Sequence, residues 1–299
     1  MATTTPAKMI AKQGPEGLSS SALVSGGDLL VRERARPVVS TGFRPLDALL
    51  PAGGVRPGSL VEWLAEGDAG PGAGGAASLA FAVACRLAAK GGGDAGESDR
   101  PRTIVVVDRT GWFHPPAVLP WLGSERRLVV ARPSRDDDEI WAIDQALRCT
   151  GVAAVLAWPR VRAGGGRRMR PAGGSAPWST AMRRWQLAAA GSGAVGLFVR
   201  PLAARTEPSW AEARVAVSPR PGGGLAERRL RLTLAGGNWS AARGDGRRTA
   251  EIVIDLMQGV AGGSRSGVGP LRLPASASVA RFDAGGGAGG RSGVTCRAS

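Results

Sequence analysis

The sequence predicts an α/β fold built on a wound, mainly parallel sheet, and two observations carry this prediction. Apolar runs of strand length alternate with segments of helical period from Val38 to about Leu256. Several of these runs are apolar almost throughout, as strands buried on both faces of a parallel sheet require. A repeated strand–helix–strand order with such strands indicates a wound α/β sheet.

The elements are expected in the following chain order. The predicted buried strands are Ser59–Leu64, Thr103–Val107, Leu128–Ala131, Val152–Ala157 and Ala194–Val199. The predicted helices are Ser78–Lys90, Asp136–Arg148 and Thr180–Ala190. Four acids, Asp136–Glu139, open the second helix, where they complement its dipole. We interpret them as a capped, solvated helix start rather than as a metal or acid–base site.

Two later segments have a different pattern. Arg229–Leu234 and Glu251–Leu256 alternate between polar and apolar residues, which predicts half-exposed antiparallel strands at one edge of the sheet. After Met257 the chain is rich in Gly, Ser, Arg and Ala without a period. We therefore expect a flexible amino-terminal segment at 1–35, one core at 36–256, and a disordered basic tail at 257–299.

The charge balance is strongly basic. The chain holds 39 Lys and Arg against 24 Asp and Glu, a net charge of +15. Such an excess favours nucleic acid as a partner, with an anionic membrane surface second. No apolar run approaches a membrane span and the amino terminus lacks the apolar core of a signal peptide, so a cytoplasmic protein is expected.

Cysteine and histidine usage narrows the chemistry. Three cysteines far apart in the sequence exclude a disulfide scaffold and a Cys-x-x-Cys metal site. His114 is the one histidine, and with no nearby Ser, Cys or paired acid it forms neither a triad nor a metal site. We expect no metal and no cofactor.

A glycine-rich segment lies where a phosphate-binding loop would lie. Gly70 to Gly75 follow a predicted strand and precede a predicted helix, and their spacing fits G-x-x-x-x-G-K-[ST]. The next two residues are Ala76 and Ala77, so both the phosphate-binding ammonium group and the magnesium-binding hydroxyl are missing. The placement fits a nucleotide loop, but the residues that act on the nucleotide are absent.

Longer stretches on both sides of this loop resemble the bacterial recombinase RecA. They are Val39–Glu62, Ile104–Asp108, Leu128–Pro133 and Ala142–Arg148. The similarity covers about residues 38–220 in the correct order. Within that superfamily the start at Val39, the strand end Ala157-Trp158-Pro159 and the segment Arg183–Leu187 most resemble ImuA. The resemblance implies a RecA-like fold with a degenerate P-loop.

The sequence departs from RecA at the positions that carry ATP chemistry. The resemblance places the loop lysine and threonine on Ala76 and Ala77, and the water-activating glutamate on Thr110, after the strand-end Asp108. It places the magnesium-organising aspartate on Trp158, and the Asn-Gln pair that relays nucleotide state near Arg200 and Pro201. Together these losses predict a pseudo-ATPase without enzymatic activity. Asp108 itself is either a remnant of the ATP site or a helix or turn cap.

An arginine- and glycine-rich segment falls where the resemblance places the first DNA-contacting loop. Its arginines are Arg160, Arg162, Arg167, Arg168 and Arg170, and Arg183 and Arg184 on the next helix would extend the set. Flexible glycines with arginines suit a phosphate backbone, without aromatic residues to stack on bases. The alternative is a solvated loop that keeps the protein soluble.

Tryptophan outnumbers phenylalanine, nine to five. Five tryptophans in the sheet region are expected in the core: Trp112, Trp121, Trp141, Trp158 and Trp185. Trp178 and Trp210 lie beside glycine or proline in predicted loops. These two are the better candidates for exposed anchors in a protein interface.

The resemblance to ImuA implies a non-catalytic accessory factor in SOS-induced, error-prone DNA repair by translesion synthesis. The expected partners are RecA, single-stranded DNA, an ImuB-like Y-family polymerase homologue and an error-prone C-family DNA polymerase, in a nucleoid-associated protein. Two alternatives stay open. One is a SulA-like inhibitor of cell division, or another protein-interaction module without DNA binding, and the other is a RecA-family ATPase.

Overall fold

A computed structural model describes residues 37–66, 73–89, 102–122, 127–159, 178–222, 224, 226–237, 248–258 and 278–280. The segment 1–35 that is expected to be flexible lies outside this range, and so do most residues of the predicted tail.

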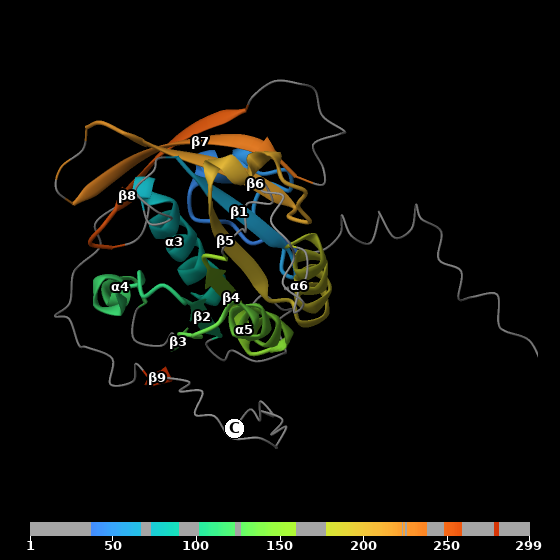
Figure 1. The fold of residues 1–299 in the computed structure, drawn as a ribbon. Coiled ribbons are helices and arrows are strands. Elements are labelled where there is room, and N and C mark those ends of the chain that lie inside the picture. The colour runs from blue at the N-terminus through green and yellow to red at the C-terminus, as the bar shows by residue number, and fades with distance from the viewer. Residues whose placement is uncertain are drawn as a thin grey trace, which may run out of the picture. The chain divides into compact units, whose positions relative to one another are not determined.

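One nine-stranded sheet organises the chain from Pro37 onward, in the order β8-β7-β6-β1-β5-β4-β2-β3-β9 (Figure 1). The strands are β1 Leu60–Ala65, β2 Thr103–Val107, β3 Arg127–Ala131, β4 Val152–Ala157, β5 Val195–Pro201, β6 Ala213–Arg220, β7 Glu227–Gly236, β8 Thr249–Asp255 and β9 Ser278–Ala280. Strands from β6 to β9 in this order pair in parallel. The β6–β7 and β7–β8 pairs are antiparallel. The protein is therefore α/β, with a mainly parallel sheet and antiparallel strands at one edge, as the sequence predicts.

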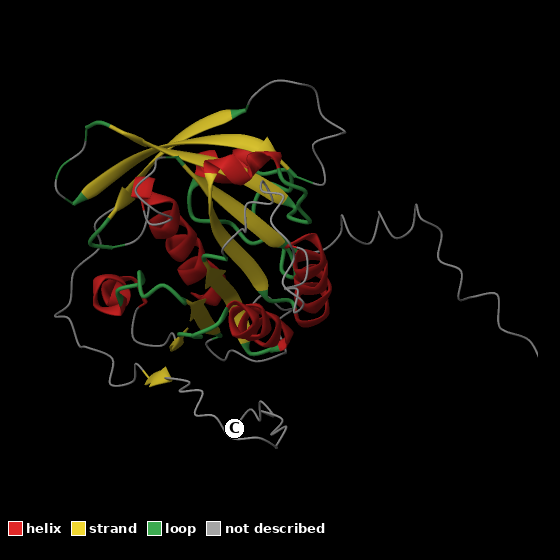
Figure 2. Cartoon of the chain, viewed as in Figure 1, coloured by secondary structure: helices red, strands yellow, loops and turns green. Residues whose placement is uncertain are grey.

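Helices cover both faces of the parallel part of the sheet (Figures 1 and 2). On one face lie α3 (Ala76–Ala89) and α4 (Pro115–Leu122), and on the other lie α5 (Asp136–Arg148) and α6 (Trp178–Ser192). Successive residues of β1 alternate between two cores, with Leu60 in the α5–α6 core and Val61 and Trp63 in the α3–α4 core. This double burial is the reason why the central strands are apolar almost throughout.

The sequence analysis does not predict three of the described helices and strands that have six or more residues. They are the short helix α2 (Arg44–Leu49), the helix α4 and the strand β6, which lies beside β1. α4 contains Pro120 and begins at Pro115-Pro116, a composition that indicates a turn. The apolar run of β6 is interrupted by Arg214, which is buried. A charged residue in the run argues against a buried strand when only the sequence is considered. Residues 278–280 of the expected tail pair with β3 as β9.

Three of the five tryptophans that are expected in the core are buried, and two are exposed. Trp121, Trp158 and Trp185 are buried, as predicted. The core assignment is wrong for Trp112 and Trp141, which are 49% and 50% exposed. Trp112 lies in the loop between β2 and α4, and Trp141 lies on the face of α5 opposite Ile143 and Leu147, so neither side chain reaches the core.

A buried carboxylate joins the three central strands. Glu62 lies in the middle of β1 and is fully buried between Arg200 of β5 and Arg214 of β6. Its Oε1 accepts hydrogen bonds from Arg200 Nη1 at 3.0 Å and from Ser209 Oγ at 3.0 Å. Its Oε2 accepts one from Arg214 Nε at 2.7 Å. Both oxygens are therefore satisfied, as a buried charge requires.

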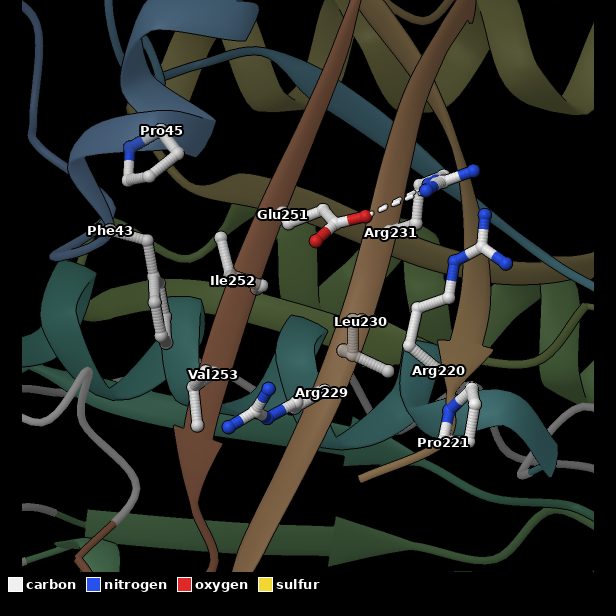
Figure 3. A pocket seen from close by; sticks show the side chains of 10 residues that line it. All are labelled: Phe43, Pro45, Arg220, Pro221, Arg229, Leu230, Arg231, Glu251, Ile252 and Val253. Carbon is white, nitrogen blue, oxygen red and sulfur yellow. Dashed lines mark hydrogen bonds and ion pairs between the residues drawn. The ribbon is translucent and has the colours of Figure 1, made fainter. Parts of the chain in front are cut away.

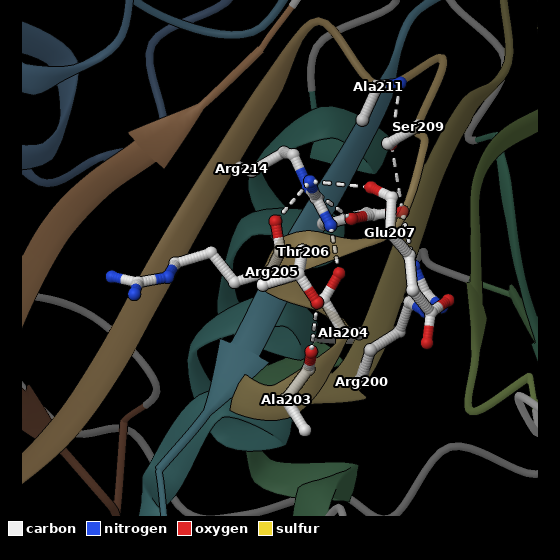
Figure 4. A network of polar contacts seen from close by, with 10 residues as sticks. Arg200, Ala203, Ala204, Arg205, Thr206, Glu207, Ser209, Ala211 and Arg214 are labelled. Carbon is white, nitrogen blue, oxygen red and sulfur yellow. Dashed lines mark hydrogen bonds and ion pairs between the residues drawn. The ribbon is translucent and has the colours of Figure 1, made fainter. Parts of the chain in front are cut away.

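The two arginines have further partners (Figure 4). Arg200 Nη2 pairs with Glu207, which follows β5 in the 3₁₀ segment Leu202–Thr206 and its cap. Arg214 Nη1 donates to the backbone oxygens of Arg205 at 3.0 Å and Glu207 at 3.1 Å. The network thus fixes the β5–β6 connection as well as the strands.

Replacing the central carboxylate is expected to destabilise the fold strongly. Glu62→Gln leaves Arg214 buried without its counter-charge and weakens the anchor of Arg200, so the free energy of unfolding should fall by about 3–5 kcal/mol. Urea unfolding measures the loss. The matched control is Glu251→Gln, which breaks the exposed Glu251–Arg231 pair of β7 and β8 and should cost about 0–1 kcal/mol. Equal losses in the two variants would contradict a special role for the buried pair.

Candidate functional site at the carboxyl edge of the sheet

The glycine-rich segment begins directly after β1, as the sequence predicts. Gly70 lies outside the described residues, but the end of the segment forms a short 3₁₀ turn, Ala73–Gly75, that leads into α3. Gly74 and Gly75 have φ values of 77° and 85°, in the left-handed region where glycine is favoured. The described part therefore has the order strand, glycine turn and helix.

The helix start is packed rather than open. Ala76 is fully buried in the α3–α4 core, and Ala77 is half-buried against it. A Cβ on Gly75 would lie 2.8 Å from Arg228 Cδ and 2.8 Å from Leu230 Cδ2, so β7 lies directly against the turn. A lysine at position 76 would have to displace this packing.

Asp108 is a cap for the loop that follows β2. Its Oδ1 accepts hydrogen bonds from Thr110 Oγ1 at 3.0 Å and from Trp112 N at 3.1 Å, and its Oδ2 accepts one from Phe113 N at 2.8 Å. The side chain is buried, and Arg132 Nε lies 3.9 Å from Oδ2. Of the two possibilities left open by the sequence, the contacts favour the turn cap. Thr110 serves the same cap.

Trp158, just past β4, belongs to a row of aromatic rings. Its side chain is 5% exposed, and its ring centroid lies 6.2 Å from that of Phe113. Phe113 lies 5.5 Å from Phe81 of α3, which lies 6.0 Å from Trp121 of α4. Trp158 therefore contributes packing, where the resemblance places a magnesium-organising carboxylate.

The acidic start of α5 is more ordered than expected. Arg109, next to Asp108, pairs with Asp136, and its Nε lies 3.7 Å from Glu139 Oε2. Glu139 is buried and Asp137 is exposed. The interpretation as a solvated helix start is therefore wrong for Glu139, because the loop after β2 supplies a cation that covers it.

The other predicted residues have separate positions. Arg160, Arg162, Arg167, Arg168 and Arg170 lie outside the described residues. Arg183 and Arg184 are exposed on α6. Arg200 lies in the buried Glu62 network, and Pro201 ends β5.

The sequence reasoning missed the Glu62 network entirely. Its ion pairs join residues 138 and 152 positions apart, and no local spacing indicates them. The one available signal was a glutamate inside an otherwise apolar strand. A buried charge in such a place needs a partner from another strand.

A pocket of about 500 Å³ lies elsewhere, at the antiparallel edge (Figure 3). It is lined by α2 together with β7, β8 and the end of β6: Phe43, Pro45, Arg220, Pro221, Arg229, Leu230, Arg231, Glu251, Ile252 and Val253. Arg220 and Arg229 are directly opposite in the β6–β7 register. The pocket includes none of the residues to which the sequence assigns a function.

Within the described part of the chain, no three His, Cys, Asp or Glu side chains gather into a possible metal site. No helix there is both long and apolar enough to cross a membrane.

Comparison with known proteins does not assign the chain to a family. No protein-family model matches the sequence, and no curated protein matches it significantly.

The cap assignment predicts a structural cost at Asp108. Asp108→Ala leaves two backbone N–H groups without their acceptor, so the free energy of unfolding should fall by about 2–4 kcal/mol. Asp108→Asn retains one acceptor oxygen and should lose less. Thermal or urea unfolding provides the measurement. The control Asp137→Ala removes an exposed acid and should stay within about 0.5 kcal/mol of the wild type. An unchanged Asp108→Ala stability would contradict the cap.

Proposed function

We propose that this protein is a RecA-like pseudo-ATPase that acts as an accessory factor in SOS-induced, error-prone DNA repair. It would bind RecA and single-stranded DNA and recruit a Y-family polymerase homologue and an error-prone C-family polymerase. The pathway and the partners come from the resemblance of the sequence to ImuA. The α/β sheet, with a strand, a glycine turn and a helix in that order, is compatible with the RecA-like part of the proposal.

One observation carries the non-catalytic part. At the carboxyl edge of the sheet, Trp158, Phe113 and Phe81 pack ring against ring, and the neighbouring Asp108 is occupied by loop hydrogen bonds. Phosphoryl transfer needs preorganised cations around the phosphates and a group that positions the nucleophile. Aromatic rings supply neither. The buried Ala76 removes the lysine from the same edge.

A nucleotide would also find little room at the helix start. Side chains of β7 lie close to Gly75, since a Cβ there would be 2.8 Å from Leu230 Cδ2 and 2.8 Å from Arg228 Cδ. Restoring the lysine of the motif at Ala76 would place a charged side chain in the core, where it would disturb packing. This argues against the alternative of a RecA-family ATPase.

The first test measures ATP hydrolysis. The purified full chain should hydrolyse ATP no faster than a buffer blank, with or without single-stranded DNA. Ala76→Lys should not create activity and should lower the melting temperature, because it places an ammonium group in the core. Ala77→Thr, at the half-buried neighbour, is the milder control. Turnover near 1 s⁻¹ in the wild type, ordinary for an enzyme, would refute the proposal.

The cellular role is the second test. Deleting the gene should lower the frequency of mutations induced by DNA damage, and a copy encoding the wild-type chain should restore it. Tagged protein should retain purified RecA on a column. Unchanged mutagenesis in the deletion strain would overturn the proposed role. Filamentous cells on overexpression, again without altered mutagenesis, would instead support the SulA-like alternative.

A further inference from the structure

The outer surface of α5 and α6 exposes large apolar side chains beside arginines. Both helices cover the same face of the sheet, and they pack against each other (Figure 1). The large apolar groups exposed here are Trp141 of α5 at 50%, Leu187 of α6 at 65% and Trp210 at 40%. We call this surface the α5–α6 patch and define it as these three residues together with Arg148, Arg183 and Arg184. Exposed apolar groups gathered on one surface commonly mark a binding site.

On α6 two arginines lie one turn before the exposed leucine. Arg183 and Arg184 precede Leu187 by four and three residues, so all three side chains are neighbours on the helix surface. The guanidinium carbon of Arg183 lies 5.4 Å from the ring centroid of Trp210, in the connection between β5 and β6. This is a cation–π contact, and it holds both groups in place at the surface.

On α5 a stripe of side chains faces α6. Trp141, Asp144 and Arg148 have the spacing i, i+3 and i+7 and therefore lie along one side of the helix. Asp144 is buried and pairs with Arg148 Nε at 2.9 Å and with Arg184 Nη2 at 3.4 Å. The hydrogen bond from Arg148 to Asp144, with the charge of that carboxylate, raises the pKa of the arginine above its usual value. Asp144 thus holds Arg148 of α5 and Arg184 of α6 where the two helices meet.

We propose that the α5–α6 patch binds single-stranded DNA, with bases stacked on Trp141 and Trp210 and phosphates on Arg148, Arg183 and Arg184. The assignment rests on the proposed function, which includes single-stranded DNA as a partner. It joins Arg183 and Arg184, which the sequence offers as an extension of the arginine loop, to Trp141 and Trp210, which the sequence assigns to the core and to a protein interface. Aromatic rings interleaved with basic groups are the pattern of sequence-tolerant single-strand binding.

The charge distribution favours DNA over a protein partner. The centres of protein interfaces are depleted in charged residues. Here Arg183 and Arg184 lie one turn before Leu187, and Arg148 lies two turns after Trp141 on the same side of α5, so charged groups are interspersed with the apolar ones. The chain as a whole carries +15, which attracts a polyanion. Asp137 and Asp138, one turn before Trp141, mark the acidic end of the patch.

The experiment titrates the full chain with oligothymidylate and follows tryptophan fluorescence and binding affinity over a range of salt concentrations. Trp141→Ala and Trp210→Ala should each weaken binding about 5-fold or more, the equivalent of one lost base stack. The Phe variants should keep most of the affinity, since a phenyl ring still stacks, while the quenching amplitude falls. Trp112→Phe removes an exposed indole outside the patch and should leave the quenching unchanged.

Charge variants give a second, independent readout. Arg183→Gln with Arg184→Gln should reduce the salt slope by about 1.4, at ~0.7 for each phosphate contact on a single strand. The matched control is Arg229→Gln with Arg231→Gln, two exposed arginines of β7, which should leave the slope unchanged. Asp137→Asn removes a repelling charge and should tighten binding.

The Phe variants keep the test decisive even where an Ala variant fails to fold. Undiminished quenching in the Trp141→Phe, Trp210→Phe double variant would overturn the proposal, and so would an unaltered salt slope in the arginine double variant. Patch variants that bind DNA normally but lose RecA would assign the surface to a protein partner and also overturn it. If only Arg167→Ala, Arg168→Ala and Arg170→Ala together abolish binding, this inference fails while the proposed function stands.

Discussion

The arrangement of the sheet depends on one buried carboxylate. Glu62 lies opposite Phe198 of β5 and Arg214 of β6, and Arg200 lies two residues beyond Phe198 on the same face. A slip of one residue in either pairing would turn these side chains to opposite faces and leave several charges buried alone. β1 and almost all of β5 are buried on both faces, so their apolar pattern alone penalises such a slip little. The ion pairs add a penalty that favours the observed register, and β1 in turn leads into the glycine turn and α3.

At the carboxyl edge next to this network, packed side chains and loop hydrogen bonds stand where the resemblance to RecA places the groups that act on ATP. Asp108 binds its own loop, Trp158 extends a row of rings, and Ala76 completes the core under β7. These contacts support one another, because the backbone N–H of Phe113 donates to Asp108 while its ring contacts Trp158. Such a set is cooperative. Under the proposed function, a charge introduced by mutation would meet packed neighbours, so a single substitution is not expected to give ATPase activity.

The parts that local pattern determines could be predicted, and those that depend on distant partners could not. β2, β4 and α5 match their predicted bounds. A strand buried on both faces is a continuous apolar run, and a helix buried on one face has a helical apolar period, so both can be recognised in the sequence. β6 was missed because a buried arginine interrupts its apolar run, and that arginine makes sense only beside Glu62. Trp141 was misplaced because residue type was weighed above its position on the helix, where Ile143 and Leu147 already define the buried side.

The two faces of the sheet imply how binding is controlled. A ligand shifts a conformational equilibrium only by binding two states unequally. With Ala76 buried and Trp158 packed on Phe113, the described residues of the α3–α4 face place packing where the resemblance to RecA places the loop lysine and the magnesium-organising carboxylate. The α5–α6 patch lies on the opposite face and is held by contacts that involve no phosphate, namely Asp144 with two arginines and Arg183 with Trp210. Under the proposed function, partner binding is therefore uncoupled from ATP. Its extent then follows from protein concentration and ionic strength, so control falls to how much of the protein is made.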